Sequence, residues 1–312
     1  MGIAEGVAIF AAGVAAGTMN AIVGSGSLIT FPTLLAFGIP PVVANVSNNV
    51  GLVPGNASAA WGYRRELAGQ RSRLLRLGIF SALGSVAGAA ALLALPAGAF
   101  KLIVPVLILL SCLLVILQPR LSARITARRQ RQAAAGSPAP AVAPAAVAPA
   151  AGEQAAGERP AGEQAAAGVD AAGAPEAAGT TPADGGAAAA PAAVTRGGPV
   201  LAGGLFGAGI YGGYFGAAQG VLVIGLLGTF LDEPMQRING AKNVLVGIVN
   251  GVAAIVYIIF AHVSWIVVLL IAVGSTLGGL LGARVGRRLP PIALRIFIVI
   301  IGVVSAVRLI FF

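Results

Sequence analysis

The chain has 312 residues, of which 57% are hydrophobic and 10% charged, a composition that indicates a membrane protein and not a soluble domain. Its net charge of +10 does not indicate a nucleic-acid partner, because most arginines form clusters that flank apolar segments. Cys112 is the only cysteine, which excludes a disulfide framework and a cysteine-based metal site.

Apolar segments of the roughly 20 residues that a membrane-spanning helix needs recur along the chain. They lie at 3–23, 42–63, 75–95 and 99–117, and then at 199–217, 238–260, 263–283 and 291–311. Shorter apolar pieces at 27–38 and 219–231 are expected to be half-helices or re-entrant legs. The glycines between 24 and 27 favour a sharp reversal before the first of them. We therefore predict an all-α polytopic membrane protein with eight to ten membrane segments.

Residues 132–197 consist mainly of Ala, Pro and Gly. With so few large apolar side chains, this segment cannot offset the entropy of ordering, and we predict a disordered linker. It would join a first membrane repeat at 1–131 to a second at 198–312. The arginines between 120 and 131 indicate that the linker is cytoplasmic.

The two membrane parts share a repeat. An offset of 194 residues aligns 13–63 with 207–257 without gaps and with eleven identities. The least expected of these in such an apolar chain are Pro40/Pro234, Asn45/Asn239, Asn49/Asn243, Asn56/Asn250 and Tyr63/Tyr257. Repeats built around amides inside apolar helices are typical of membrane transporters.

The arginine clusters orient the two copies. A basic cluster directly follows the segment 42–63, whereas after 238–260 the next basic cluster comes one crossing later. The positive-inside rule then predicts that the first segment runs from outside to inside and the second in the opposite direction. We therefore expect two inverted repeats, with five crossings each if the short pieces span the membrane.

The asparagines and the tyrosine of each copy fall within roughly 40° of one another on a helix. An amide in hydrocarbon needs a partner, so each stripe should face protein or a water-filled cavity. One interpretation is that the amides only bond neighbouring helices, at roughly 1 kcal/mol each. The other is that they line a substrate path near the middle of the membrane.

Lys242 stands where the first copy has Asn48. An ammonium inside a span is costly and could bind an anion beside Asn239 and Asn243, or it could be a helix-end lysine at the cytoplasmic surface. Past Glu5, the predicted spans contain no Asp or Glu, so the usual carboxylate for coupling to protons or sodium is missing. Asp232 and Glu233 are expected to form a solvated helix start.

The predicted substrate site combines polar residues of both copies and of the two glycine-containing reversals. Its members are Ser25, Ser27, Asn45, Ser47, Asn48, Asn49, Asn56, Gln219, Asn239, Lys242, Asn243 and Asn250. We expect no catalytic residue, metal ligand or cofactor, because HExxH and GxSxG motifs are missing and the only histidine, His262, stands at a predicted loop. The expected partners are a small anionic substrate and the lipid bilayer, and a homo-oligomer is left open.

The run GSGSLITFPTLL at 24–35, followed by GIPP at 38–41 and ANVSNN at 44–49, resembles the TauE/SafE family. Members of that family are called sulfite exporters or toluenesulfonate uptake permeases. The resemblance is strong over 13–63 and weaker in the second half, where GAAQG at 216–220 replaces the glycine cluster. It implies a multi-pass inner-membrane permease for small sulfur-containing anions such as sulfite or sulfonates. The alternative is a permease for a metal cation or a neutral metabolite through the same amide-lined path.

Overall fold

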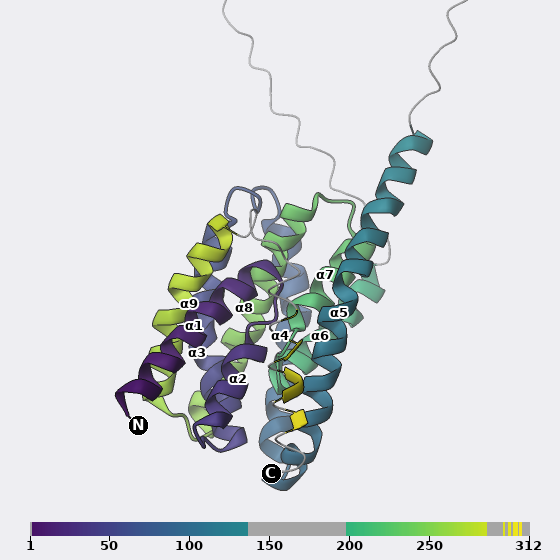
Figure 1. Cartoon of the computed structure of the whole chain (residues 1–312). Helices are drawn as coiled ribbons and strands as arrows, with labels where there is room; N and C mark the ends of the chain where they lie inside the picture. Colours follow the sequence, from purple (N-terminus) through teal and green to yellow (C-terminus); the bar gives the residue numbers. More distant parts are fainter. Residues whose placement is uncertain are drawn as a thin grey trace, which may run out of the picture. The chain divides into compact units, whose positions relative to one another are not determined.

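The computed structural model describes residues 2–136 and 198–285, with a few further positions between 296 and 307. The regular elements of these residues are all helices, shown in Figure 1. They are α1 (Ile3–Ile22), α2 (Ser27–Ala36), α3 (Pro41–Gly62), α4 (Arg71–Ala94), α5 (Ala97–Gly136), α6 (Gly198–Tyr214), α7 (Gln219–Phe230), α8 (Met235–Phe260) and α9 (Trp265–Val285). The all-helical fold class is confirmed, and each predicted segment up to residue 283 corresponds to one helix.

Two predicted segments lie largely outside the described residues. One is the last apolar segment, 291–311, and the other is the linker from residue 137 onward. The first residues of the predicted linker, 132–136, belong to α5, which continues to Gly136.

Five helices of the described part are long and apolar enough to cross a membrane: α1, α4, the stretch Gly98–Arg120 of α5, α8, and Trp265–Arg284 of α9. The 22-residue helix α3 is as long, but it carries four asparagines, Asn45, Asn48, Asn49 and Asn56. The prediction of eight to ten membrane segments stays a prediction.

The outer faces of α4, α5 and α9 expose large apolar side chains, as expected for helices that face lipid. Exposed examples are Leu75, Ile79, Leu83 and Val86 on α4, Leu102, Val106, Leu113 and Ile116 on α5, and Ile266, Leu269, Val273 and Leu277 on α9. The polar side chains of α3 point the other way, since all four of its asparagines are at most 5% exposed.

The two halves of the molecule interlock. The first helix of each half packs against the fourth helix of the other half, α1 against α9 and α6 against α4. The third helices, α3 and α8, pack against each other and also against α9 and α4 respectively. Helices of each half therefore pack mainly against helices of the other half, and neither half forms a separate bundle.

Glycines allow the close approach of these crossed pairs. An ideal Cβ on Gly84 of α4 would lie 2.1 Å from the Phe206 carbonyl oxygen of α6. An ideal Cβ on Gly278 of α9 would likewise lie 2.0 Å from the Val14 carbonyl oxygen of α1. Small residues spaced in this way let membrane helices touch along their backbones. Gly84 and Gly278 are related by the 194-residue offset, so the same packing device is used twice.

Helices α3 and α8 run in opposite directions. At one end, Arg237 near the start of α8 donates to the carbonyl of Ala68, just after α3, at 3.0 Å. At the other end, the Ser264 N–H, just after α8, donates to Ser47 Oγ near the start of α3 at 2.9 Å. The two copies of the repeat are thus antiparallel within the structure, and their orientation across a membrane stays a prediction.

Candidate functional site

The first helix break separates α1 from α2 at residues 23–26. Gly24 has φ +85°, which glycine adopts at little cost, and its N–H donates to the Met19 carbonyl at 2.9 Å to end α1. The side chain of Asn20 holds the reversal, because its Oδ1 accepts from the Gly26 N–H at 2.7 Å. The Asn20 amide also donates to Asn56 Oδ1 of α3 at 3.4 Å.

The second break, at residues 215–218 between α6 and α7, is built in the same way. Gly216 has φ +77°, and its N–H donates to the Tyr211 carbonyl at 3.0 Å. Ala218 has φ +58°, a value that a non-glycine residue rarely adopts. Ser111 of α5 donates to the Ala217 carbonyl at 3.1 Å, and the Tyr211 hydroxyl donates to the same carbonyl. These bonds hold the strained segment in place.

The structural correspondence between the breaks is shifted by two residues from the 194-residue alignment. Gly24 matches Gly216 in its conformation, and the ends of α1 and α6 at Ile22 and Tyr214 are likewise 192 residues apart. Asn20 then corresponds to Gly212. Because Gly212 lacks a side chain, the Gln219 amide fills this space, and an ideal Cβ on Gly212 would lie 2.4 Å from Gln219 Oε1. Each break thus holds one amide in an equivalent place.

The two breaks touch each other. The Gly220 N–H donates to the Gly24 carbonyl at 3.1 Å, and an ideal Cβ on Gly24 would lie 2.5 Å from the Gly220 Cα. Only backbone fits between the two segments at this point. The contact therefore requires glycine on both sides.

Donors from each half cap the broken helix of the other half. Lys242 of α8 donates from Nζ to the carbonyls of Asn20 at 2.7 Å and Ala21 at 3.2 Å, at the end of α1. Asn45 of α3 donates to the Tyr214 carbonyl at the end of α6 at 2.9 Å. The last carbonyls of a helix have no partner within it and carry partial negative charge. Lys242 and Asn45 give these carbonyls hydrogen-bond donors in the interior.

Lys242 is fully buried, with 0% of its surface exposed. The interpretation of this residue as a solvated helix-end lysine is therefore wrong. The difference from Asn48 of the first copy also has a local cause. Asn48 bonds the Thr30 hydroxyl of α2, whereas α7 carries apolar Leu222 and Ile224 in the matching region. With no hydroxyl on its own side, Lys242 reaches across to α1 instead.

Several buried polar atoms at the breaks have no hydrogen-bond partner among the described residues. They are Ser25 Oγ, Asn49 Oδ1, Asn56 Nδ2, Tyr214 Oη and Gln219 Oε1. Asn49 lies beside the second break, since an ideal Cβ on Gly216 would be 4.0 Å from Asn49 Nδ2. Buried polar atoms are nearly always paired in proteins, so a cluster of unpaired ones needs an explanation. A bound polar ligand would supply the missing partners.

The remaining predicted site residues do not all lie at the breaks. Asn243 stands at 3.5 Å from the Ala21 carbonyl and belongs to the first break. Ser47 and Asn48 are occupied elsewhere, by Ser264 and Thr30 respectively. Ser27 and Asn250 are buried on α2 and α8, whereas Asn239 is only partly buried near the start of α8. The members of the predicted set that lie at or beside the breaks are Ser25, Asn45, Asn49, Asn56, Gln219, Lys242 and Asn243, and their role in binding stays a prediction.

The prediction missed Asn20, Thr30 and Tyr214. Asn20 is an amide in an apolar segment directly before the glycine cluster, the same signal that identified the other asparagines. Thr30 and Tyr214 carry no such signal, because a hydroxyl in an apolar helix commonly bonds a carbonyl of its own helix.

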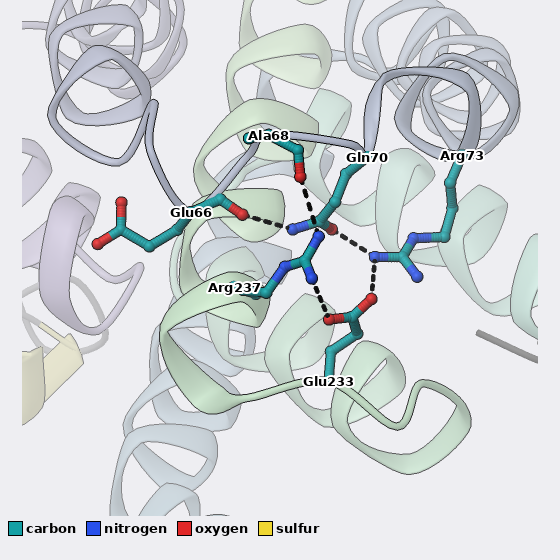
Figure 2. A network of polar contacts seen from close by, with 6 residues as sticks. All are labelled: Glu66, Ala68, Gln70, Arg73, Glu233 and Arg237. Carbon is teal, nitrogen blue, oxygen red and sulfur yellow. Dashed lines mark hydrogen bonds and ion pairs between the residues drawn. The ribbon is translucent and has the colours of Figure 1, made fainter. Parts of the chain in front are cut away.

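Glu233 is not the solvated helix start that the sequence predicts. Its side chain is 9% exposed and lies between Arg73 at 3.0 Å and Arg237 at 3.2 Å, as Figure 2 shows. The connection from α3 to α4 folds over it, with Arg237 bonding Ala68 and Arg73 bonding Gln70. Burial of this carboxylate is possible because both neighbouring guanidinium groups pair with it.

Comparison with known proteins agrees with the membrane assignment. A family model described as "Sulfite exporter TauE/SafE" matches residues 9–309, which confirms the resemblance of the glycine-rich run. A "Probable membrane transporter protein ORF9" of Sinorhizobium sp. is 32% identical over 113 residues, 36% of this chain and 43% of that protein. A "Probable membrane transporter protein" of Haemophilus influenzae is 33% identical over 113 residues, 36% of this chain and 44% of that protein. The match spans less than half of each relative, and no solved structure matches the chain.

Proposed function

Because this chain belongs to the sulfite exporter TauE/SafE family, we propose that it carries a small anion of the sulfite and sulfonate class across the cell membrane. Two relatives that are named as probable membrane transporter proteins support transport as the general activity. We place the substrate where the two helix breaks meet.

The observation that carries this proposal is the cluster of unpaired buried polar atoms at the breaks. Ser25, Asn49 and Gln219 belong to both halves and are each at most 5% exposed. An amide can turn either its oxygen or its nitrogen toward a ligand, and a serine hydroxyl can donate. Such a set can replace the hydration shell of a small oxyanion without moving the backbone.

The charge distribution favours an anion over a cation. The short helices α2 and α7 begin at the breaks, so their positive N-terminal ends point toward the junction. The negative C-terminal ends of α1 and α6 are instead covered by Lys242 and Asn45. A cation at the junction would meet two positive helix ends and a buried ammonium. An anion would be attracted by all three.

The antiparallel relation of α3 and α8 supports alternating access. We propose that the two copies form an inverted repeat in the membrane, with the junction of the breaks near its middle. Opening at either end would then expose the same junction to one side at a time. The opposing directions of α3 and α8 support such a pseudo-twofold relation.

The test is uptake by purified protein in liposomes. We expect vesicles preloaded with unlabelled sulfite to accumulate radioactive sulfite by exchange, and we expect methanesulfonate to compete. Gln219→Leu, which keeps the size but removes the amide, should abolish exchange. Thr229→Val is the matched control, because the Thr229 hydroxyl is exposed and bonds only the Gly225 carbonyl of its own helix.

Three outcomes separate the alternatives. Exchange of sulfite that depends on Gln219 supports the proposal. Transport of a divalent metal ion or of a neutral amino acid, with no exchange of any sulfur oxyanion, would overturn the anion assignment and favour the alternative substrate classes. Sulfite exchange that is unchanged by Gln219→Leu would overturn the proposed position of the site.

A further inference from the structure

An ion-pair cluster closes one end of the molecule. Glu233, in the connection between α7 and α8, pairs with Arg73 at the start of α4 and with Arg237 at the start of α8. We call these three residues the latch. Gln70 and Ala68 of the α3–α4 connection bond its two arginines, so the latch ties this connection to the second half (Figure 2).

Among the described residues, the opposite end shows no such cluster. The 194-residue offset, which holds for α3 and α8, relates Glu233 to Ile39, Arg237 to Val43 and Arg73 to Val267. All three counterparts are apolar. One end of a pseudo-symmetric structure is thus held by charges and the other by apolar packing. The two ends should therefore respond differently to an anion.

The latch lies close to the junction of the breaks. Along α8, Arg237 precedes Lys242 by five residues, or about 7.5 Å of helix axis. Lys242 contacts the end of α1 next to Gly24. The four residues between them on α8, in the sequence RINGAK, are all uncharged. Arg237 of the latch therefore lies between one and two turns of α8 from Lys242.

The arginines of the latch can accept a second anion. The Nε atoms of Arg73 and Arg237 are buried and have no hydrogen-bond partner among the described residues. A guanidinium offers five donors, and Glu233 uses only some of them. Each of the two guanidinium groups thus has a free donor. An oxyanion could bind both groups in competition with the Glu233 carboxylate.

We propose that the latch is an anion-operated gate and the first binding site for substrate at this end. An incoming oxyanion takes the place of the Glu233 carboxylate between Arg73 and Arg237, which releases the α3–α4 connection and opens the way to the breaks. The proposal rests on the proposed function for the identity of the anion. The opening of the latch can nevertheless be measured without transport.

Thiol labelling measures the opening. Cys112 is replaced by Ser, and Ser25→Cys then places the only thiol at the first break. In membrane vesicles of defined orientation, a charged, impermeant methanethiosulfonate reagent reaches this thiol only when one end opens. Glu233→Gln should raise the labelling rate from the latch end roughly tenfold, the ratio for about 1.4 kcal/mol, and leave the rate from the other end unchanged.

Matched variants keep the result interpretable. Asp232→Asn removes the same charge one residue away, at an exposed side chain, and should leave labelling unchanged. Arg73→Gln should also raise labelling, and the double variant should not exceed Glu233→Gln, because Glu233→Gln already removes the Arg73 pair. Equal labelling of Glu233→Gln and Asp232→Asn, or faster labelling of Glu233→Gln from both ends alike, would overturn the proposal.

A small anion supplies the second test. Methanesulfonate is used, because sulfite reacts with the labelling reagent. Methanesulfonate should accelerate labelling from the latch end when Glu233 is present, and it should have no effect on Glu233→Gln. Gluconate at the same ionic strength should not accelerate labelling of either protein. Acceleration by both anions alike would show simple screening and overturn the gate. If the gate behaves as expected but liposomes exchange no sulfur oxyanion, the latch stands and only the substrate assignment fails.

Discussion

The Gly220 N–H donates to the Gly24 carbonyl at 3.1 Å, so the helix break of one half is bonded to the break of the other. The breaks form one structural unit even though almost 200 residues separate them. A displacement of either segment changes the position of the other, because only backbone separates them. This coupling is what a site shared between two moving halves requires.

Gly24→Ala tests the contact between the breaks, with Gly38→Ala as its control. Both glycines have positive φ, +85° and +76°, so both variants carry a similar backbone cost of roughly 1–2 kcal/mol. Only Gly24 has Gly220 within reach of a Cβ, whereas nothing lies within 4 Å of Gly38. We expect Gly24→Ala to unfold at a clearly lower temperature in detergent and to lose sulfite exchange. Equal behaviour of the two variants would contradict the contact.

Lys242→Met tests the buried ammonium. The variant leaves the carbonyls of Asn20 and Ala21 without a donor, which should lower the free energy of unfolding by about 1–3 kcal/mol, and it removes a positive charge beside the junction. We therefore expect loss of anion exchange. Asn48→Met, at the corresponding position, breaks only the bond to Thr30 and should keep measurable exchange. Anion exchange by Lys242→Met at the normal rate would exclude a role for the charge.

Asn45→Ala and Asn239→Ala form a second matched pair, because the repeat aligns the two residues. Asn45 donates to the Tyr214 carbonyl, whereas Asn239 is partly exposed and its Oδ1 has no partner in the described part of the chain. Loss of a buried amide bond between membrane helices costs roughly 1 kcal/mol. Asn45→Ala should thus show the larger drop in unfolding temperature. The reverse order would show that the cap on α6 is not important for stability.

Gly278→Ala tests the close packing of α1 and α9. Its Cβ would meet the Val14 carbonyl oxygen at 2.0 Å, so the helices must separate, at a cost of about 1–3 kcal/mol. Gly207→Ala is the control, since nothing lies within 4 Å of Gly207 on α6. That change should be neutral or stabilise by up to roughly 1 kcal/mol. Thermal unfolding in detergent distinguishes the two.

Much of the local structure follows from sequence patterns. Apolar segment length predicts that α3 begins at 42 and α8 at 238, against 41 and 235 in the structure, and the glycines between 24 and 27 predict the first break. The long-range partners cannot be predicted in this way. A buried amide or ammonium needs an acceptor, but the pattern does not say that Lys242 finds it 222 residues away at Asn20.

The latch shows a second limit of prediction. A carboxylate next to a proline at a segment end is usually a solvated helix start, and no local signal distinguishes Glu233 from such a residue. Its burial depends on Arg73, 160 residues earlier, which only the packing of α4 against α8 brings near. The two-residue shift between the breaks cannot be seen in an ungapped alignment, because that alignment pairs Gly26 with Gly220, whereas the backbone conformations pair Gly24 with Gly216.

Each half caps a helix of the other half, and this has a consequence for folding during synthesis. The first half is synthesised and inserted while α1 still lacks both Lys242, which caps its end, and α9, which packs along it. Asn45 likewise has no Tyr214 carbonyl to bond until α6, which follows the segment 137–197, has been synthesised. The native contacts of α1 with α8 and α9 therefore cannot form until both helices have been synthesised.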